Sequence, residues 1–391
     1  MCFDWSKLLR AIILLLFIPF TSFRTIYKHF PQPLELSFAF LILWGIAIYI
    51  VLTPNFIKRV KKYFDNPIIF FIMLGFSIAA RLLLYPLVDG IGFGSTGDDA
   101  FFLPINRLLN IERPYEIKLY DGAPISPGMG WLLINVPFGI SDLFPYLVPI
   151  YLGFTAYALN KYFKSWLLVN LVIAIFMSTT IFWTLLGSGH DLVAVALTII
   201  ISFIAVELHI KSSRKWYLVA IMVGCFSTSR IVFIALPFLF MVLLFRYHRL
   251  YAIKFFCLSL SFTILFHLVG YIISDWYQPF HLIHRGFNNI GTGVILIGSV
   301  FLIFAVIFMY SYAGKTMYSR LISYALIIGI LFSIIAIGEL RSVGYDFSRW
   351  EGLSYLYVAS PIVVLAVISK HFKVDVAEMG GFKICPGDKS K

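Results

Sequence analysis

Long apolar stretches constrain the fold of this chain more than any other feature. Several of them approach or exceed the roughly 20 apolar residues with which a helix crosses a bilayer. Of the 391 residues, 60% are hydrophobic and only 13% are charged, and the mean hydropathy is +0.91. A soluble domain of this length needs a far more polar surface. We therefore predict an all-α polytopic membrane protein.

The apolar runs predict about 11 or 12 transmembrane helices in a single domain over residues 1–370. We expect these helices at residues 8–23, 35–53, 67–88, 131–158, 166–186, 190–210, 216–229, 231–245, 255–273, 291–313, 320–338 and 354–369. The first run lacks a small-x-small cleavage site, so we interpret it as a retained helix and not as a signal peptide. Residues 371–391 are expected to form a cytoplasmic tail.

Short basic loops between these runs predict the orientation in the membrane. They lie at residues 58–62, 161–164, 211–215, 246–254, 314–320 and from 370 onward. The alternate loops are less basic and should face outward; they are 89–130, 187–189, 274–290 and 339–353. The same rule accounts for the net charge of +12, so we expect no nucleic-acid binding. The compact layout suits a bacterial inner membrane.

The apolar segment 216–245 has basic loops on both sides. Its length is too short for two full crossings and too long for one. We expect two short helices that fold back at Ser227-Thr228-Ser229-Arg230, a turn that would line a wet cavity. One long tilted helix is the alternative.

The longest stretch between spans, residues 89–130, should hold amphipathic juxtamembrane helices. Its apolar residues recur at three- and four-residue spacing at Phe102, Ile105, Leu108 and Leu109. This spacing predicts an interfacial helix over residues 99–111. Pro104 should restrict its start, because proline is tolerated only in the first helical turn. The prolines and glycines of residues 121–130 predict turns, either as a plain return to the next span or as a rigid lip over a substrate cavity.

Two adjacent carboxylates, Asp98 and Asp99, follow Gly97 in this outer loop. Such a pair can bind a metal or act as a general base. Helix N-capping is the alternative, and it needs only one of them. His190 and Asp191 follow a glycine-rich turn on the same predicted face, where they could orient a proton, contact sugar hydroxyls or start a helix.

Arg230 lies in the expected hairpin turn, and a buried arginine in a membrane requires an anionic partner. That partner is either an internal carboxylate or a ligand phosphate. Arg341 and Arg349 precede the last span, and their guanidinium groups match phosphate oxygens. Arg349 could instead pair with Glu351 or anchor the interface.

The loop 274–290 carries His284 and Arg285, which are candidates for phosphate or sugar contact. The His281-x-x-His284 spacing indicates a metal site only weakly, because no third or fourth ligand is evident. Together, the outer-face carboxylates and arginines suit transfer from a phosphate-linked donor that resides in the membrane.

Three short motifs resemble the GT-C superfamily of polytopic glycosyltransferases. The first runs through Gly97-Asp98-Asp99-Ala100-Phe101-Phe102, Leu108-Leu109, Arg113-Pro114-Tyr115 and Ser126-Pro127-Gly128. The second is Arg230-Ile231-Val232 with Pro237, and the third is Arg349 with Tyr355 and Pro361. The resemblance covers residues 67–365 and is nearest to the mannosyltransferase-like group. Unlike the common pattern, two spans precede the one that carries the acidic loop.

The resemblance implies a GT-C-like fold and a polyprenyl-phosphate sugar as donor. Asp99, or alternatively Asp98, would be the general base of an inverting displacement that transfers the sugar to a lipid or glycan acceptor on the extracytoplasmic face. Arg230, Arg341 and Arg349 would stabilise the lipid phosphate, and no metal is implied. The alternative functions are a lipid-linked polysaccharide polymerase and a transporter or flippase of an anionic glycolipid.

Overall fold

The computed structural model describes residues 5–88, 96–120, 122–209, 215–245, 249–280, 291–312 and 316–371. Over these ranges the chain is helical and contains no strand, which confirms the predicted all-α class. The α-helices are α1 (Trp5–Phe17), α2 (Phe23–His29), α3 (Pro33–Val51), α4 (Pro54–Phe64), α5 (Pro67–Val88), α6 (Thr96–Leu109), α7 (Met129–Ile134), α8 (Leu147–Phe163), α9 (Trp166–Met177), α10 (Thr180–Gly187), α11 (Leu192–His209), α12 (Trp216–Phe226), α13 (Ala235–Phe245), α14 (Arg249–Ile273), α16 (Thr292–Tyr312), α17 (Met317–Ser342) and α18 (Gly352–His371). Five short 3₁₀ helices join them, namely η1 (Phe20–Ser22), η2 (Val136–Gly139), η3 (Phe144–Tyr146), η4 (Ile231–Ile234) and η5 (Phe347–Arg349).

Eight helical segments of the described chain are long and apolar enough to cross a membrane. They are Leu8–His29, Pro33–Val51, Pro67–Leu87, Leu192–His209, Arg249–Ile273, Thr292–Tyr312, Met317–Ser342 and Gly352–Ser369. A ninth is counted if α9 and α10, which meet at an angle of 76°, form one broken span. The protein is therefore a multi-pass membrane protein, with fewer full-length spans than the 11 or 12 expected.

The number of full-length spans is smaller than expected because some helices end before they could cross a membrane. The span expected at 131–158 is interrupted, because α7 ends at Ile134 and the chain then passes through η2 and η3 before α8 begins. Pro137 and Pro145 lie in these two 3₁₀ helices, and proline cannot donate the backbone hydrogen bond that would continue an α-helix. At the α9–α10 bend, the Thr179 side chain accepts a hydrogen bond from the backbone N–H of Phe182 and caps a new helix.

The prediction of two short helices over residues 216–245 is confirmed. The Trp216 ring, at the start of α12, lies 5.6 Å from the ring of Tyr251 near the start of α14. Phe240, at the middle of α13, lies 6.0 Å from Phe255. The start of α12 and the middle of α13 therefore both lie beside the first turns of α14, and the chain folds back at residues 227–230.

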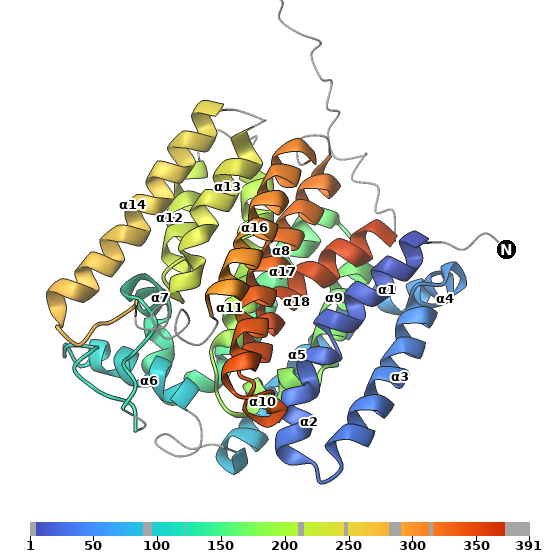
Figure 1. The fold of residues 1–391 in the computed structure, drawn as a ribbon, viewed down its shortest axis with the longest axis horizontal. Helices are drawn as coiled ribbons and strands as arrows, with labels where there is room; N and C mark the ends of the chain where they lie inside the picture. The colour runs from blue at the N-terminus through green and yellow to red at the C-terminus, as the bar shows by residue number, and fades with distance from the viewer. Residues whose placement is uncertain are drawn as a thin grey trace, which may run out of the picture.

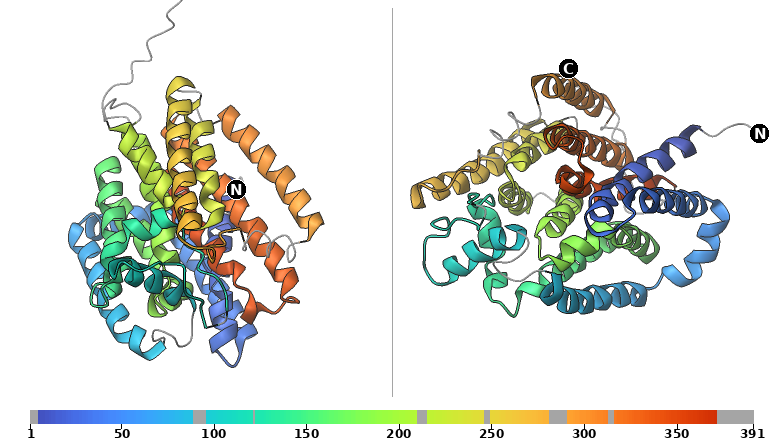
Figure 2. Two further views of the ribbon diagram at one scale, coloured as in Figure 1. Left: turned by 90° about the vertical axis from the view of Figure 1, so that its left-hand side faces the viewer. Right: turned by 60° about the horizontal axis from the view of Figure 1, so that its bottom comes forward.

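Helix α11 lies at the centre of the bundle, where it packs against α8, α12 and α18. Helices α3, α5 and α16 lie at the periphery (Figure 2) and expose most of their apolar side chains. Such exposure suits contact with lipid tails. At one end of the bundle, Glu207 of α11 accepts two hydrogen bonds from Arg320 of α17, each 2.6 Å long, and this buried pair joins the two helices.

The other end of the bundle holds α6, which carries Asp98 and Asp99. In Figure 1, α6, α10 and α2 all lie toward its lower edge. Helix α4, which carries the basic residues Arg59 and Lys61, packs instead beside α9. The helix arrangement thus separates the acidic loop from the basic loops, as the predicted orientation requires.

We expect labelling of single cysteines to report this orientation. In a variant whose four native cysteines are replaced by serine, a membrane-impermeant thiol reagent should label Glu112→Cys in intact cells. It should label Lys61→Cys only after the membrane is permeabilised. Both positions are exposed, so accessibility in the folded protein does not limit either reaction. Labelling of position 61 in intact cells, without labelling of position 112, would reverse the orientation.

Candidate functional site

Asp98 and Asp99 lie in the first turn of α6. This helix begins at Thr96 and not at residue 99 as predicted, so Asp98 and Asp99 are inside it and not at its N-cap. Their charges lie near the positive end of the helix dipole, where carboxylates are stabilised. Both side chains are buried, with exposed fractions of 0% and 2%.

The helix expected over residues 99–111 is confirmed as an element, but its details differ. Pro104 lies in the interior of α6, so the expectation that it fixes the start of the helix is wrong. Phe102 and Ile105 are buried inside the protein, whereas Leu109 is exposed. The apolar side of α6 packs against Phe144 and Gly139 of the segment that follows α7.

Gly189 is the point at which three parts of the chain meet near Asp98. A Cβ atom built on Gly189 would lie 2.9 Å from Asp98 Cβ, 2.9 Å from Arg81 Nη2 and 3.0 Å from Tyr85 Cε2. Gly189 has φ +78°, which also favours glycine. The Tyr85 hydroxyl donates a 3.0 Å hydrogen bond to Asp98 Oδ2. Helix α5 and the turn at residues 187–191 therefore enclose Asp98.

Arg81 is a functional candidate that the sequence interpretation missed. Its guanidinium group is buried, donates hydrogen bonds to the carbonyl oxygens of Leu186 and Gly187, and lies 3.7 Å from the centre of the Tyr85 ring. The sequence does carry a signal for it, because Arg81 is a charged residue within the apolar run Pro67–Val88. A charge in such a run marks a functional or structural polar site.

His190 connects the 187–191 turn to α6. A Cβ atom on Gly97 would lie only 2.3 Å from His190 Cδ2, so the imidazole packs directly on the backbone beside Asp98. Its Nδ1 accepts a hydrogen bond from the backbone N–H of Leu192 and lies 3.3 Å from Asp191 Oδ1. The imidazole is partly exposed, with a side-chain exposed fraction of 22%.

Asp191 and Arg230 form a buried bidentate ion pair. Arg230 Nη1 and Nη2 donate to the two carboxylate oxygens at 3.1 and 2.5 Å, and Trp131 Nε1 donates to Asp191 Oδ2 at 2.8 Å. Tyr355 of α18 also hydrogen-bonds Arg230. Burial alone would raise the pKa of Asp191, but the charges of Arg230 and His190 outweigh it and hold this pKa below its usual range. Of the two partners predicted for Arg230, the structure contains the internal carboxylate.

The turn at residues 227–230 is also hydrogen-bonded to the segment at residues 128–131. The backbone N–H of Gly128 donates to the Thr228 carbonyl oxygen at 2.7 Å, and that of Trp131 donates to Thr228 Oγ1 at 2.7 Å. A Cβ atom on Gly128 would lie 2.9 Å from Thr228, so glycine permits this close approach. The proline- and glycine-rich segment therefore holds Trp131 against Asp191.

The two late arginines lie apart from this buried cluster. Arg349 has a side-chain exposed fraction of 79%, and its Nε lies 3.5 Å from Asp346 Oδ2. Glu351, the partner considered for it from the sequence, pairs with Arg24 of α2 instead, at 3.4 Å. Arg341 is exposed near the end of α17. His284 and Arg285 lie outside the described residues.

The seven predicted residues with described positions thus fall into two groups. Asp98, Asp99, His190, Asp191 and Arg230 gather around the 187–191 turn, together with the unpredicted Arg81, Tyr85 and Trp131. Arg349 and Arg341 are exposed. Among the residues that the structure describes, no three His, Cys, Asp or Glu side chains are placed to hold a metal ion.

No family model, curated protein or solved structure matches this chain.

The contact between Gly97 and His190 leads to a prediction about stability. Replacing a helical glycine by alanine ordinarily stabilises a helix by about 1 kcal/mol. Gly97→Ala should instead destabilise the protein by about 1–3 kcal/mol, because the new methyl group overlaps the imidazole ring. Gly75→Ala on α5 is the matched control, since no atom lies within 4 Å of the added Cβ. Denaturant unfolding in detergent compares the two; equal stabilities would show that the ring moves aside freely.

Proposed function

We propose that the protein is a membrane glycosyltransferase of the GT-C type. It transfers a sugar from a polyprenyl-phosphate donor to a lipid or glycan acceptor on the extracytoplasmic face. The observation that carries this proposal is the pair of buried carboxylates in the first turn of α6, where Gly97 and Asp98 pack against the 187–191 turn with its His190 and Asp191. This arrangement supplies a positioned carboxylate at the end of the bundle where an amphiphilic donor would present its sugar.

In this proposal Asp99 is the general base. Its carboxylate takes the proton of the acceptor hydroxyl while that oxygen attacks the anomeric carbon. The bond from the anomeric carbon to the phosphate oxygen breaks, and polyprenyl phosphate leaves with the bonding electrons. The attack comes from the face opposite the leaving group, so the anomeric configuration inverts. Asp98 is the alternative base, and its Oδ2 accepts a hydrogen bond from the Tyr85 hydroxyl.

The buried ion pair of Asp191 and Arg230 has a positioning role in this proposal. Arg230 is fully engaged with Asp191, so its charge is compensated inside the protein. The pair fixes the 187–191 turn on which His190 is carried, and His190 in turn contacts the backbone beside the two aspartates. His190 is partly exposed and is the residue of this cluster best placed to contact the sugar.

The exposed arginines are the candidates for the lipid phosphate. Arg341 lies in the last turn of α17, Arg349 lies in η5 within the segment that joins α17 and α18, and both are exposed. A phosphate with two or three free oxygens can accept hydrogen bonds from more than one guanidinium group. We assign to them the stabilisation of the charge that develops on the leaving phosphate, and the sequence adds His284 and Arg285 as further candidates for this role.

The test separates transfer from transport and from polymerisation. Purified protein in proteoliposomes is supplied with polyprenyl-phosphate sugars labelled in the sugar, and with a membrane lipid extract as acceptor. The proposal predicts loss of label from the donor, release of polyprenyl phosphate and a product that carries one added sugar. Movement of intact donor across the bilayer would identify a transporter, and products of many repeated units would identify a polymerase; either result contradicts the proposal.

A further inference from the structure

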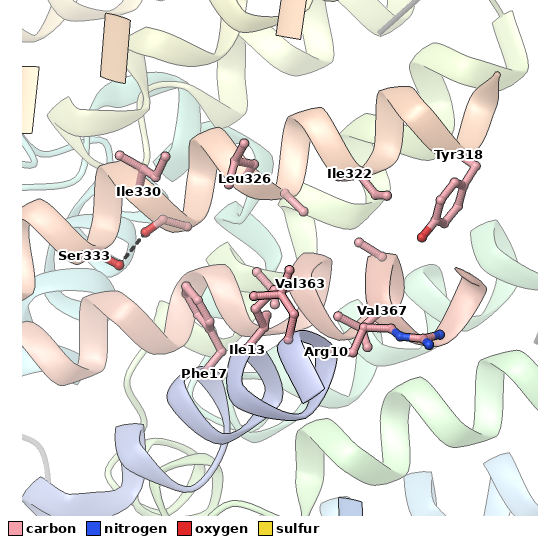
Figure 3. Close-up of a pocket in the computed structure, with 14 residues that line it drawn as sticks. Arg10, Ile13, Phe17, Tyr318, Ile322, Leu326, Ile330, Ser333, Val363 and Val367 are labelled. Atoms are coloured by element: carbon pink, nitrogen blue, oxygen red, sulfur yellow. Dashed lines mark hydrogen bonds between the residues drawn. The ribbon is translucent and has the colours of Figure 1, made fainter. Parts of the chain in front are cut away.

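A membrane-facing groove lies between α1, α17 and α18, away from the site described above. It has a volume of about 300 Å³. Apolar side chains line it almost throughout, among them Ile13, Phe17, Ile322, Leu326, Val363 and Val367. Figure 3 shows these side chains converging from the three helices. Leu9 and Leu326, at its edges, are exposed on the surface of apolar spans, so the groove opens toward lipid.

The groove has one charged end. Arg10 of α1, beside Val367, and Tyr318 of α17 both line the groove at that end, on facing walls (Figure 3). At the opposite end the polar lining residue is Ser333, whose hydroxyl donates to the carbonyl oxygen of Gly329 and is satisfied within its own helix. The groove therefore presents a cationic head site followed by an apolar channel.

The dimensions and the position of the groove suit one lipid. From Tyr318 to Ser333 the wall advances 15 residues along α17, which corresponds to roughly 22 Å of helix. This is comparable with a long acyl chain that starts at the interface and passes the midplane of a hydrocarbon core about 30 Å thick. The charged end lies on the side of the Glu207–Arg320 pair, since Arg320 follows Tyr318 by two residues. This is the end of the bundle assigned to the basic loops.

We propose that this groove binds one anionic glycerophospholipid of the cytoplasmic leaflet. Its phosphate group pairs with the Arg10 guanidinium and accepts the Tyr318 hydroxyl, and one acyl chain fills the apolar channel. A zwitterionic lipid would fill the same channel but would bring its own cation beside Arg10, so binding should favour the anionic lipid. The site is separate from the carboxylate cluster and does not depend on the function proposed for it.

Native mass spectrometry of the full-length protein, released from detergent with defined lipids, tests the assignment. The probes are phosphatidylglycerol, phosphatidylcholine and a polyprenyl phosphate. We expect one phosphatidylglycerol to be retained in preference to phosphatidylcholine. Arg10→Gln should lower its retention roughly fivefold, the effect of one basic residue near an anionic lipid, and should leave phosphatidylcholine unchanged. Arg59→Gln on α4, a basic residue that is exposed and lies outside the groove, is the control.

A second variant tests the channel without touching the charge. Leu326→Trp should fill the groove and lower retention of both phospholipids, whereas Ile303→Trp on the exposed face of α16 should not. Both substitutions are at lipid-exposed positions, so folding should tolerate them. The proposal is overturned if Arg10→Gln affects retention no more than Arg59→Gln does. It is also overturned if Leu326→Trp affects retention no more than Ile303→Trp does, because the lipid would then bind only by general contact. Arg10-dependent retention of the polyprenyl phosphate in preference to phosphatidylglycerol would overturn the choice of lipid.

Discussion

Arg230→Met should destabilise the folded protein by about 3–5 kcal/mol, because it leaves the Asp191 carboxylate buried without its counter-charge. Asp191 is fully buried and accepts two hydrogen bonds from Arg230 and one from Trp131. Denaturant unfolding in detergent, followed by tryptophan fluorescence, measures the change.

Two further variants show that the loss comes from the unpaired charge. The double variant Asp191→Asn/Arg230→Met should recover most of the stability, since asparagine keeps an acceptor for Trp131 and no buried charge remains. Arg349→Met removes a guanidinium group from an exposed pair and should cost less than about 1 kcal/mol. If Arg230→Met is no more destabilising than Arg349→Met, the pair does not stabilise the 187–191 turn.

Asp99→Asn should lower the rate constant of sugar transfer by roughly 10²–10⁴-fold, the usual contribution of a general base. Asparagine has nearly the same shape as aspartate but cannot take the acceptor proton. The measurement is single-turnover release of sugar from a polyprenyl-phosphate donor by folded, purified protein. Asp99→Glu should retain part of the rate, because it keeps a carboxylate at the same turn of α6.

The control variants separate the base from its neighbours. Asp98→Asn keeps an oxygen that accepts the Tyr85 hydroxyl, so its effect on the chemical step should be smaller than that of Asp99→Asn. Glu116→Gln, in an exposed pair with Arg113, should leave the rate unchanged. If Asp98→Asn causes the larger fall, the base is Asp98. Near-wild-type rates for both aspartate variants would remove the general-base mechanism.

The all-α membrane class was predictable because the hydropathy of each segment depends only on its residues and not on how the helices pack. The turn at residues 227–230 was predictable for a related reason, since the length of an apolar segment and the charges that flank it limit how it can cross a membrane. The count of spans was less predictable. A hydropathy window does not register that proline residues interrupt the run from 131 to 158, or that Ser178 and Thr179 end one helix and cap another.

The candidate site was predictable in its residue types but not in its pairing. Asp98, His190 and Arg230 belong to segments far apart in the sequence, and only the packing of α5, α6 and α11 brings them together. The sequence left open whether Arg230 holds a carboxylate or a phosphate, because that choice depends on which side chain faces it across the bundle. Arg81 was missed although its charge in an apolar span is a direct signal.

The anomeric configuration of the product is the most direct test of sugar transfer by a single displacement. Wild-type protein is given a polyprenyl-phosphate sugar of known configuration. The configuration of the glycosidic product is then read from the one-bond coupling constant between its anomeric carbon and the proton on that carbon. A single displacement assisted by an aspartate base predicts release of polyprenyl phosphate together with a product of inverted configuration. A product of retained configuration would contradict that mechanism, and recovery of the donor with its sugar still attached would contradict glycosyl transfer itself.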